Sequence, residues 1–292
     1  MDISSKEIIG DCPINSNCDW KFLYKSEFNQ FQLPIYRCNT CGLQAQFPIP
    51  SQNLESIYNE EYYTGKSEYK YKDERKTEKF DTYVWDARLR NIKKFIASGN
   101  FLDIGASFGG FLARAKFFGF TPFGVEVSKY SAEYAKQRGI KIYNTEFLKA
   151  DLEENFFDVV TMIEVIEHLD KPKEVFEKLF RILKPNGLLV LQTANFEGKQ
   201  AMQEERNYHY YLPGHLVYYS RSNLERILQN VGFRKTIMYY GVDFSLLAKL
   251  KKSRGSFQNI SDYKNWFRIS YYHLKSKLWK GSTSSMVMYA VK

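Results

Sequence analysis

The first candidate for chemistry is Asp103, a carboxylate placed directly before a glycine-rich turn. The apolar run at residues 100–104 predicts a buried strand, and Gly105, Gly109 and Gly110 follow it. The next apolar residues recur at helical spacing. Strand, tight turn and helix form the first crossover of a doubly wound α/β domain, and a ligand is expected where the turn meets the helix.

The side chains of this turn favour a cationic ligand over a dinucleotide. A dinucleotide-binding turn has a middle glycine that lets the backbone approach the pyrophosphate, but this chain has Ser107 there. Asp103 would also repel phosphates. S-adenosylmethionine contains no phosphate and carries an ammonium and a sulfonium group. We therefore predict S-adenosylmethionine, and not NAD, as the ligand of the turn.

A second carboxylate, Glu126, ends the strand predicted at residues 122–127. An acid roughly 20 residues past a glycine turn holds the two hydroxyls of a ribose in nucleotide-binding folds. The alternative is an exposed acid at a strand end. Together with the glycine turn, the spacing favours ribose binding.

The order of the motifs resembles the class I S-adenosylmethionine-dependent methyltransferases, and most of all the bacterial branch that modifies small molecules and surface sugars. The resemblance spans about residues 91–233 and the last strand near residues 286–291. It is carried by LDIGASFGGFL (102–112), GVEVS (124–128), FDVVTMIEVIEHL (157–169), LKPNGLLVLQTAN (183–195) and PGHLVYYS (213–220). The family usually has glycine where Ser107 stands.

The resemblance and the strand ends together indicate a set of cofactor contacts. The loop after the third strand meets adenine in this family, which suggests Asn144, with Asp151 as a rival. A tyrosine before the domain tends to close over the cofactor, here Tyr62 or Tyr63. The predicted cofactor residues are Asp103, Gly105, Ala106, Ser107, Gly109, Glu126, Val127, Asn144, Thr145, Ile163 and Glu164.

His215 is the candidate catalytic base, because a histidine can accept a proton near neutral pH and this one lies in a Pro-Gly turn near the expected acceptor. Similar sugar methyltransferases use the histidine of a matching His-x-x-Tyr-x-Ser segment as base. The alternative is a histidine that orders the loop through a backbone hydrogen bond. Glu164 and His168, four residues apart, are expected to share a helix face. The Glu167–His168 pair is expected to shape the cofactor pocket.

All four cysteines, Cys12, Cys18, Cys38 and Cys41, lie near the N-terminus. Cytosolic disulfides are rare, whereas two cysteine pairs near 20 residues apart are typical of a structural zinc site. The wide Cys12–Cys18 spacing leaves unligated thiols as the alternative. Similar methyltransferases often begin with such a module, which supports zinc.

The glycine turn and the strand pattern predict an α/β fold. The resemblance implies a doubly wound seven-stranded sheet of the Rossmann-like methyltransferase type, preceded by a small zinc-binding module, with a final strand inserted antiparallel. Helices are expected before the first strand and between strands. The predicted domains are a zinc-binding module (1–50), a tyrosine-rich connector or lid (51–76), the methyltransferase domain (77–243), and a basic helical cap with the last strand (244–292).

The charge lies mainly in the last segment. The chain of 292 residues has a net charge of +9, and residues 244–292 hold ten basic residues against Asp262 alone. This charge suggests an anionic partner: an anionic small-molecule acceptor such as a nucleotide sugar, a membrane surface contacted peripherally, or a nucleic acid. The alternative is a solvated helical face without a partner. No apolar stretch is long enough for a signal peptide or membrane span, so we expect a cytoplasmic protein. The oligomeric state is open.

The sequence therefore predicts in-line methyl transfer to a small molecule, namely a sugar or nucleotide sugar of surface polysaccharide, or a secondary metabolite. Two alternatives remain open. One is an RNA methyltransferase that uses the zinc module and the basic tail, although no Asn/Asp-Pro-Pro-aromatic motif is present. The other is a cofactor-binding protein without activity. No specific nucleic acid partner is expected.

Overall fold

The structure, a computed structural model, describes residues 12, 14, 19–27, 32–46, 57–64, 73–279 and 284–292. Its centre is a seven-stranded sheet with the order β10-β11-β8-β7-β4-β5-β6. The strands are β4 (Gly99–Ile104), β5 (Phe120–Val125), β6 (Lys141–Tyr143), β7 (Phe157–Ile163), β8 (Leu183–Ala194), β10 (Lys235–Tyr240) and β11 (Ser285–Val291).

The sheet has the predicted doubly wound topology. Strands β8, β7, β4, β5 and β6 are parallel, and β11 lies antiparallel between β8 and β10. The strand order reverses between β4 and β7. In open α/β sheets a ligand binds at the carboxyl ends of the strands at such a point, which places the site beyond Ile104 and Ile163.

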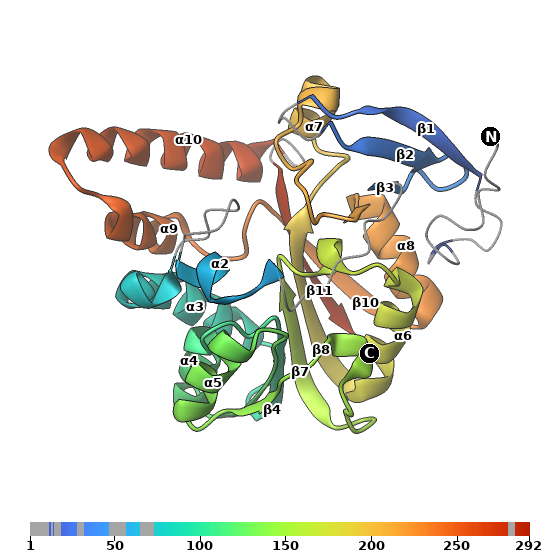
Figure 1. The fold of residues 1–292 in the computed structure, drawn as a ribbon. Coiled ribbons are helices and arrows are strands. Elements are labelled where there is room, and N and C mark those ends of the chain that lie inside the picture. Colours follow the sequence, from blue (N-terminus) through green and yellow to red (C-terminus); the bar gives the residue numbers. More distant parts are fainter. Residues whose placement is uncertain are drawn as a thin grey trace.

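Helices cover both faces of this sheet (Figure 1). On one face lie α3 (Glu78–Ile92), α4 (Gly110–Phe117) and α5 (Lys129–Gln137), and on the other lie α6 (Pro172–Ile182) and α8 (Arg221–Val231). Each face has its own apolar core, built from alternate residues of the same strands. On β7, for example, Val159 belongs to the core under α3 and α4, whereas Val160 belongs to the core under α6.

A second, four-stranded sheet joins the N-terminal segment to the end of the methyltransferase motifs. It has the order β1-β2-β3-β9 and consists of β1 (Trp20–Lys25), β2 (Pro34–Cys38), β3 (Gln44–Gln46) and β9 (Val217–Tyr218). Strand β3 pairs antiparallel with β9, so the N-terminal strands contact the segment that follows His215.

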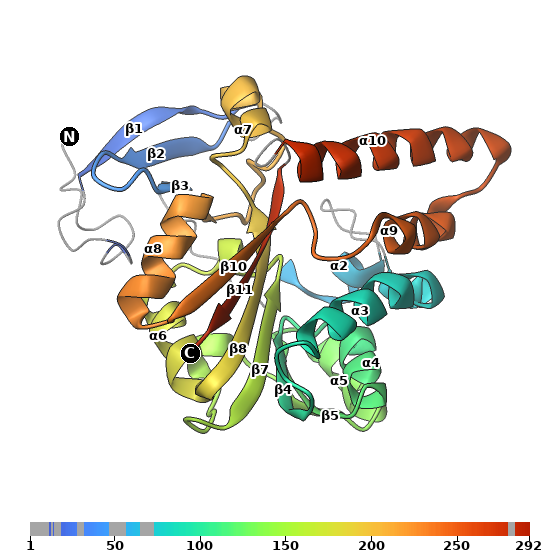
Figure 2. The ribbon, with the colours of Figure 1, turned by 180° about the vertical axis from the view of Figure 1, so that it is seen from behind.

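Two further helices form an arm that extends from one side of the body (Figures 1 and 2). They are α9 (Leu246–Ser253), which packs on α3, and α10 (Lys264–Leu278), which packs on α9. The remaining elements are short: α2 (Glu60–Thr64), α7 (Lys199–Glu204), η2 (Glu74–Lys76), η3 (Phe147–Lys149), η4 (Ile166–His168), η5 (Glu205–Asn207), η6 (Arg254–Ser256) and η7 (Ile260–Tyr263). In the described part of the chain no helix is long and apolar enough to span a membrane.

Ser220 caps α8 in a capping box with Asn223. Residues 184–187 are part of β8, which contains Asn186 at a positive φ of 64°. One local expectation from the sequence is wrong. Glu164 and His168 share no α-helical face, because Glu164 has a φ of 54° and a 3-10 helix begins only at residue 166.

Candidate active site

The glycine turn after β4 has the backbone geometry that its sequence predicts. Gly105, Ser107 and Gly109 all have positive φ, at 79°, 48° and 73°. Ser107 therefore adopts the conformation of the family's glycine, which is uncommon for a residue with a side chain. The amides of Gly105 and Ala106 donate to the carbonyl of Val125, and these bonds fix the turn against the next strand.

The two predicted cofactor carboxylates lie buried at this turn. Asp103 accepts a hydrogen bond of 2.5 Å from Thr161 Oγ1. Burial raises the pKa of Asp103 to about 7, although this hydrogen bond opposes the increase. Burial also raises the pKa of Glu126, against the hydrogen bonds from the amides of Ser128 and Ser107. Both carboxylates would therefore be stabilised by a partner that brings positive charge or hydroxyl donors.

Glu126 links the turn to the segment that precedes the domain. Its carboxylate accepts from Ser107 N at 2.8 Å, Ser128 N at 2.9 Å and Tyr63 Oη at 3.2 Å. Of the two tyrosines named as candidate lid contacts, it is thus Tyr63 that reaches Glu126. The hydroxyl of Ser107 is buried and has no partner among the described residues. It is available to a ligand held in the turn.

The side chain of Asn144, the predicted adenine contact, lies against the loop after β5. Its side-chain amide donates to the backbone carbonyls of Glu126 at 2.8 Å and Val127 at 3.1 Å. These bonds order the loop after β5, and the amide nitrogen is engaged there. Thr145 follows with its own amide bonded to the carbonyl of Tyr143.

At the end of β7, Ile163 and Glu164 lead into a buried polar network. Glu164 Oε1 accepts from Gln192 at 2.7 Å, and Gln192 accepts from Arg88. Arg88 forms a buried ion pair with Asp243 at 2.8 Å, and Tyr289 donates to the same carboxylate. The network connects the strand end to the start of the α9–α10 arm.

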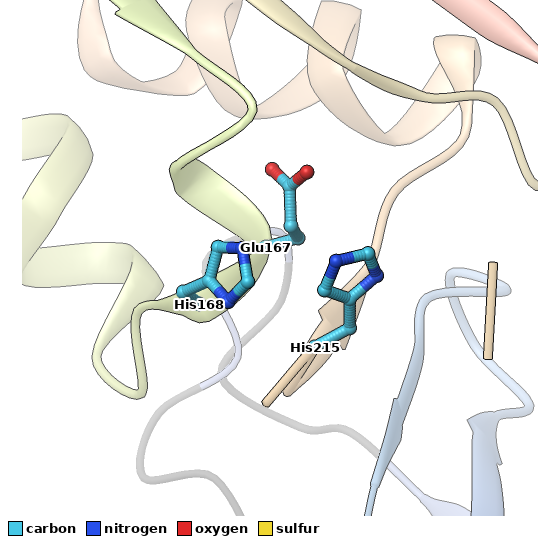
Figure 3. A group of neighbouring side chains, drawn as sticks. All are labelled: Glu167, His168 and His215. Carbon is cyan, nitrogen blue, oxygen red and sulfur yellow. The ribbon is translucent and has the colours of Figure 1, made fainter. Parts of the chain in front are cut away.

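A cluster of ionisable side chains lies beside this strand end and consists of Glu167, His168 and His215 (Figure 3). Their ligand atoms all lie within 4.8 Å of one another. The two imidazole rings meet edge to face with centroids 4.7 Å apart. His215 comes from the loop before β9, so the fold unites residues that are distant in the sequence.

Hydrogen bonds define which nitrogen of each ring is free. His168 Nδ1 lies 2.9 Å from the carbonyl of Gly214, and His215 Nδ1 lies 3.0 Å from the carbonyl of Tyr210. A carbonyl can only accept, so each Nδ1 carries a proton and each Nε2 keeps its lone pair. This backbone support is typical of histidines that ligate metals.

Glu167, the third residue of the cluster, has one carboxylate oxygen without a hydrogen-bond partner among the described residues. Glu167 Oε2 accepts from Thr193 at 3.0 Å, whereas the buried Oε1 has no partner in the described residues. Burial and the charge of Glu164 raise the pKa of Glu167 well above its ordinary value. Burial lowers the pKa of His168 to about 3, with a further contribution from His215, and lowers the pKa of His215 to about 4.

Both rings are therefore neutral at physiological pH. Two neutral imidazole nitrogens and one carboxylate oxygen form a donor set that suits a divalent cation. The sequence analysis missed the joint role of Glu167 and His168, although the Glu-x-x-Glu-His spacing from Glu164 was visible. The convergence on His215 depends on the tertiary fold.

Three of the four cysteines of the predicted zinc site lie together in the structure. Cys12, Cys38 and Cys41 are all buried and form no disulfide. The sulfur atoms of Cys12 and Cys41 are 3.7 Å apart. Contacts with the thiols of Cys12 and Cys38, together with burial, raise the pKa of Cys41. Three thiols therefore gather in one place, and Cys18 lies outside the described residues.

Comparison with known proteins gives the family. Residues 74–236 match the family model described as a methyltransferase domain. An uncharacterized protein of Methanocaldococcus jannaschii is 26% identical over 154 residues, which cover 52% of this chain and 72% of that protein. A ubiquinone biosynthesis O-methyltransferase of Rickettsia prowazekii is 32% identical over 102 residues, or 32% of this chain and 39% of the enzyme. The chain thus spans well under half of that enzyme.

Solved structures share the fold. A phosphoethanolamine N-methyltransferase 2 of Haemonchus contortus, solved with S-adenosylmethionine, has a TM-score of 0.56 at 16% identity and covers 94% of this chain and 69% of that one. A possible histamine N-methyltransferase of Thermotoga maritima has a TM-score of 0.51 at 18% identity and covers 75% of this chain and 95% of that one.

Proposed function

This chain belongs to the methyltransferase-domain family and is an S-adenosylmethionine-dependent methyltransferase, and from that premise we propose that it methylates a hydroxyl group of a small molecule beside a divalent cation held by Glu167, His168 and His215. The observation that carries the proposal is the buried donor set of two free imidazole nitrogens and one unpaired carboxylate oxygen. It lies at the end of β7, next to the predicted cofactor turn.

The residues of the turn fit the cofactor. The unpaired hydroxyl of Ser107 and the buried carboxylates of Asp103 and Glu126 offer polar atoms that a ligand can satisfy. In this assignment Asp103 faces the cationic amino-acid part and Glu126 the ribose. S-adenosylmethionine supplies a methyl group on a sulfonium, which is already a good leaving group. The chain has to orient an oxygen nucleophile in line with that methyl group and accept its proton.

A cation at the cluster explains the proton chemistry better than a lone histidine base. With a pKa of about 4, His215 holds a proton weakly at neutral pH, whereas an efficient base has a pKa near the working pH. A bound divalent cation lowers the pKa of a coordinated hydroxyl and leaves it more nucleophilic. His215 then serves as a ligand, with its ring held by the Tyr210 carbonyl.

The acceptor class rests on the sequence resemblance and on relatives. The resemblance favours a sugar or nucleotide sugar. Among the relatives, the ubiquinone biosynthesis enzymes are O-methyltransferases by name. A hydroxylated small molecule agrees with both.

The test combines cation binding with turnover. We expect Mn²⁺ or Mg²⁺ to bind the purified chain. With hydroxylated acceptors present, EDTA should abolish the conversion of S-adenosylmethionine to S-adenosylhomocysteine, and added cation should restore it. Glu167→Gln removes a direct ligand and should weaken cation binding by at least about 10–100-fold, which is the loss caused by removing an outer-shell partner of a metal ligand. The control Glu174→Gln changes an exposed acid on α6 and should leave binding unchanged. Turnover that persists in EDTA would contradict the proposal.

We further propose that Cys12, Cys38 and Cys41 hold a structural zinc ion, with Cys18 as the fourth ligand. Four thiolates would close the site, so the metal would stabilise the N-terminal strands and take no part in the reaction. The support is the meeting of three buried thiols. Metal analysis of the purified chain should find about one zinc per chain, and Cys38→Ser should lose it. A zinc-free, fully folded wild type would contradict this assignment.

A further inference from the structure

Helix α10 presents an apolar stripe to solvent. Phe267, Tyr271, Leu274 and Leu278 follow one another at spacings of four, three and four residues, so they lie on one face of the helix. Their exposed fractions are 82%, 57%, 52% and 71%. A surface helix of a globular protein normally packs such a face against the core. An exposed apolar stripe of this kind therefore indicates an interaction surface.

The opposite face of α10 already has its own packing. His273 and Ser276 are buried, and the Trp266 indole donates to Ser253 Oγ at 2.9 Å. Lys277 Nζ donates to the carbonyl of Val242 at 2.9 Å, and this hydrogen bond joins the C-terminal end of the helix to the segment before α9. The helical spacing therefore places the stripe on the face of α10 opposite these contacts. Helix α10 itself forms the outer edge of the arm (Figures 1 and 2).

Basic side chains run along one flank of the stripe. By helical spacing Lys264, Arg268 and Lys275 lie beside it, and the helix contains no acidic residue. Trp279 follows the helix with 62% of its surface exposed. An exposed apolar stripe with basic and aromatic neighbours is the composition of a helix that lies in a membrane interface.

We propose that the outer face of α10 docks the protein onto an anionic lipid surface. The charge of this segment favours an anionic surface over a second copy of the chain. Residues 244–292 carry ten basic residues against one acid, so two such arms would repel each other. The apolar stripe selects lipid over a nucleic acid, since phosphate contacts need only the basic residues. The helix lies parallel to the surface, with Phe267, Leu274 and Leu278 entering the acyl boundary.

The experiment is sedimentation of the full chain with vesicles of phosphatidylcholine alone or with phosphatidylglycerol. We expect binding to the mixed vesicles that weakens with added salt. The double variant Phe267→Ser/Leu274→Ser should bind about 100-fold more weakly, at roughly tenfold for each large apolar side chain. Lys264→Glu/Arg268→Glu should bind the mixed vesicles more weakly by at least about fivefold for each charge removed.

Matched controls come from α4, on another part of the molecule. Phe117→Ser removes a phenylalanine with 74% exposure, and Lys116→Glu reverses an exposed charge. Both should bind vesicles like the wild type, and all variants should bind S-adenosylhomocysteine normally. The readout needs no methyl transfer, so its failure is separate from failure of the proposed function.

Two results would overturn the proposal. One is the absence of binding to phosphatidylglycerol vesicles at low salt, or binding that the α10 variants leave unchanged. The other is a concentration-dependent dimer in the absence of lipid that Phe267→Ser/Leu274→Ser abolishes, which would assign the stripe to a second copy.

Discussion

Cofactor affinity should depend on pH through Asp103, and the structure gives the size of the effect. The carboxyl of Asp103 has a pKa of about 7 because it is buried, although the hydrogen bond from Thr161 opposes the increase. A cationic ligand selects the ionised form. Affinity should therefore fall as the pH falls through 7, by up to about tenfold per pH unit.

Between pH 8 and pH 5 the ionised fraction of a group with a pKa of 7 falls about 100-fold, which corresponds to about 2.7 kcal/mol of binding free energy. Calorimetric titration with S-adenosylhomocysteine at several pH values would measure this change. The matched control is Asp103→Asn, which keeps the shape of the side chain and removes its titration. The difference between wild type and variant cancels any contribution from Glu126 or from the ligand itself.

A second variant tests the cause of the shift. Thr161→Val removes the hydroxyl that stabilises the ionised form of Asp103, so the pH dependence should move to higher pH. Equal slopes in the wild type and Asp103→Asn would refute the reasoning, because the carboxylate would then not meet the cationic part of the ligand. An affinity in Asp103→Asn equal to that of the wild type at pH 8 would refute it as well.

Three other predictions follow from the same buried groups. Folding raises the pKa of the Asp103 carboxyl from 3.8 to about 7, because the buried site favours the protonated form. The contribution of this group to folding stability is therefore fully present below pH 3.8 and is lost as the pH rises through 7. Asp103→Asn without ligand should thus gain up to about 4 kcal/mol over the wild type between pH 4 and pH 8 in urea unfolding. Arg88→Met should cost about 3–5 kcal/mol in the same assay, because it leaves Asp243 buried and unpaired, and a loss under 1 kcal/mol would contradict this. Gly105→Ala should cost about 1–3 kcal/mol of stability and weaken S-adenosylhomocysteine binding, because φ is 79° and the new Cβ would lie 2.6 Å from Val165 Cγ2. Unchanged binding would contradict the assignment of the cofactor to this turn.

The parts of the fold that depend on local sequence could be predicted. The glycines after Ile104 require a tight turn, and the Ser220–Asn223 spacing predicts the helix cap. The order of the motifs along the chain then gives the order of strands in the sheet. Each of these signals lies within a few residues of the feature that it determines.

The rest of the candidate site depends on contacts between distant residues. Arg88 meets Asp243 across 155 residues, and no local pattern links the two. His168 and His215 likewise converge only through the packing of η4 beside β9. The wrong expectation for Glu164 has a local cause, since an α-helical pattern was extended into a strand end where the backbone adopts a positive φ.

The sheet that joins β3 to β9 also has a consequence for synthesis on the ribosome. Gln46 Nε2 donates to the carbonyl of His215 at 2.6 Å, across 169 residues. Translation proceeds at about 5–20 residues per second, so the segment around β9 leaves the ribosome roughly 10–30 s after the N-terminal strands. Throughout this interval the edge of β3 has no strand to pair with and is open to wrong contacts. The proposed zinc ion, if bound early by the cysteines, would hold these strands together until β9 is synthesised. The speed of translation and the supply of metal would then jointly affect the yield of folded protein.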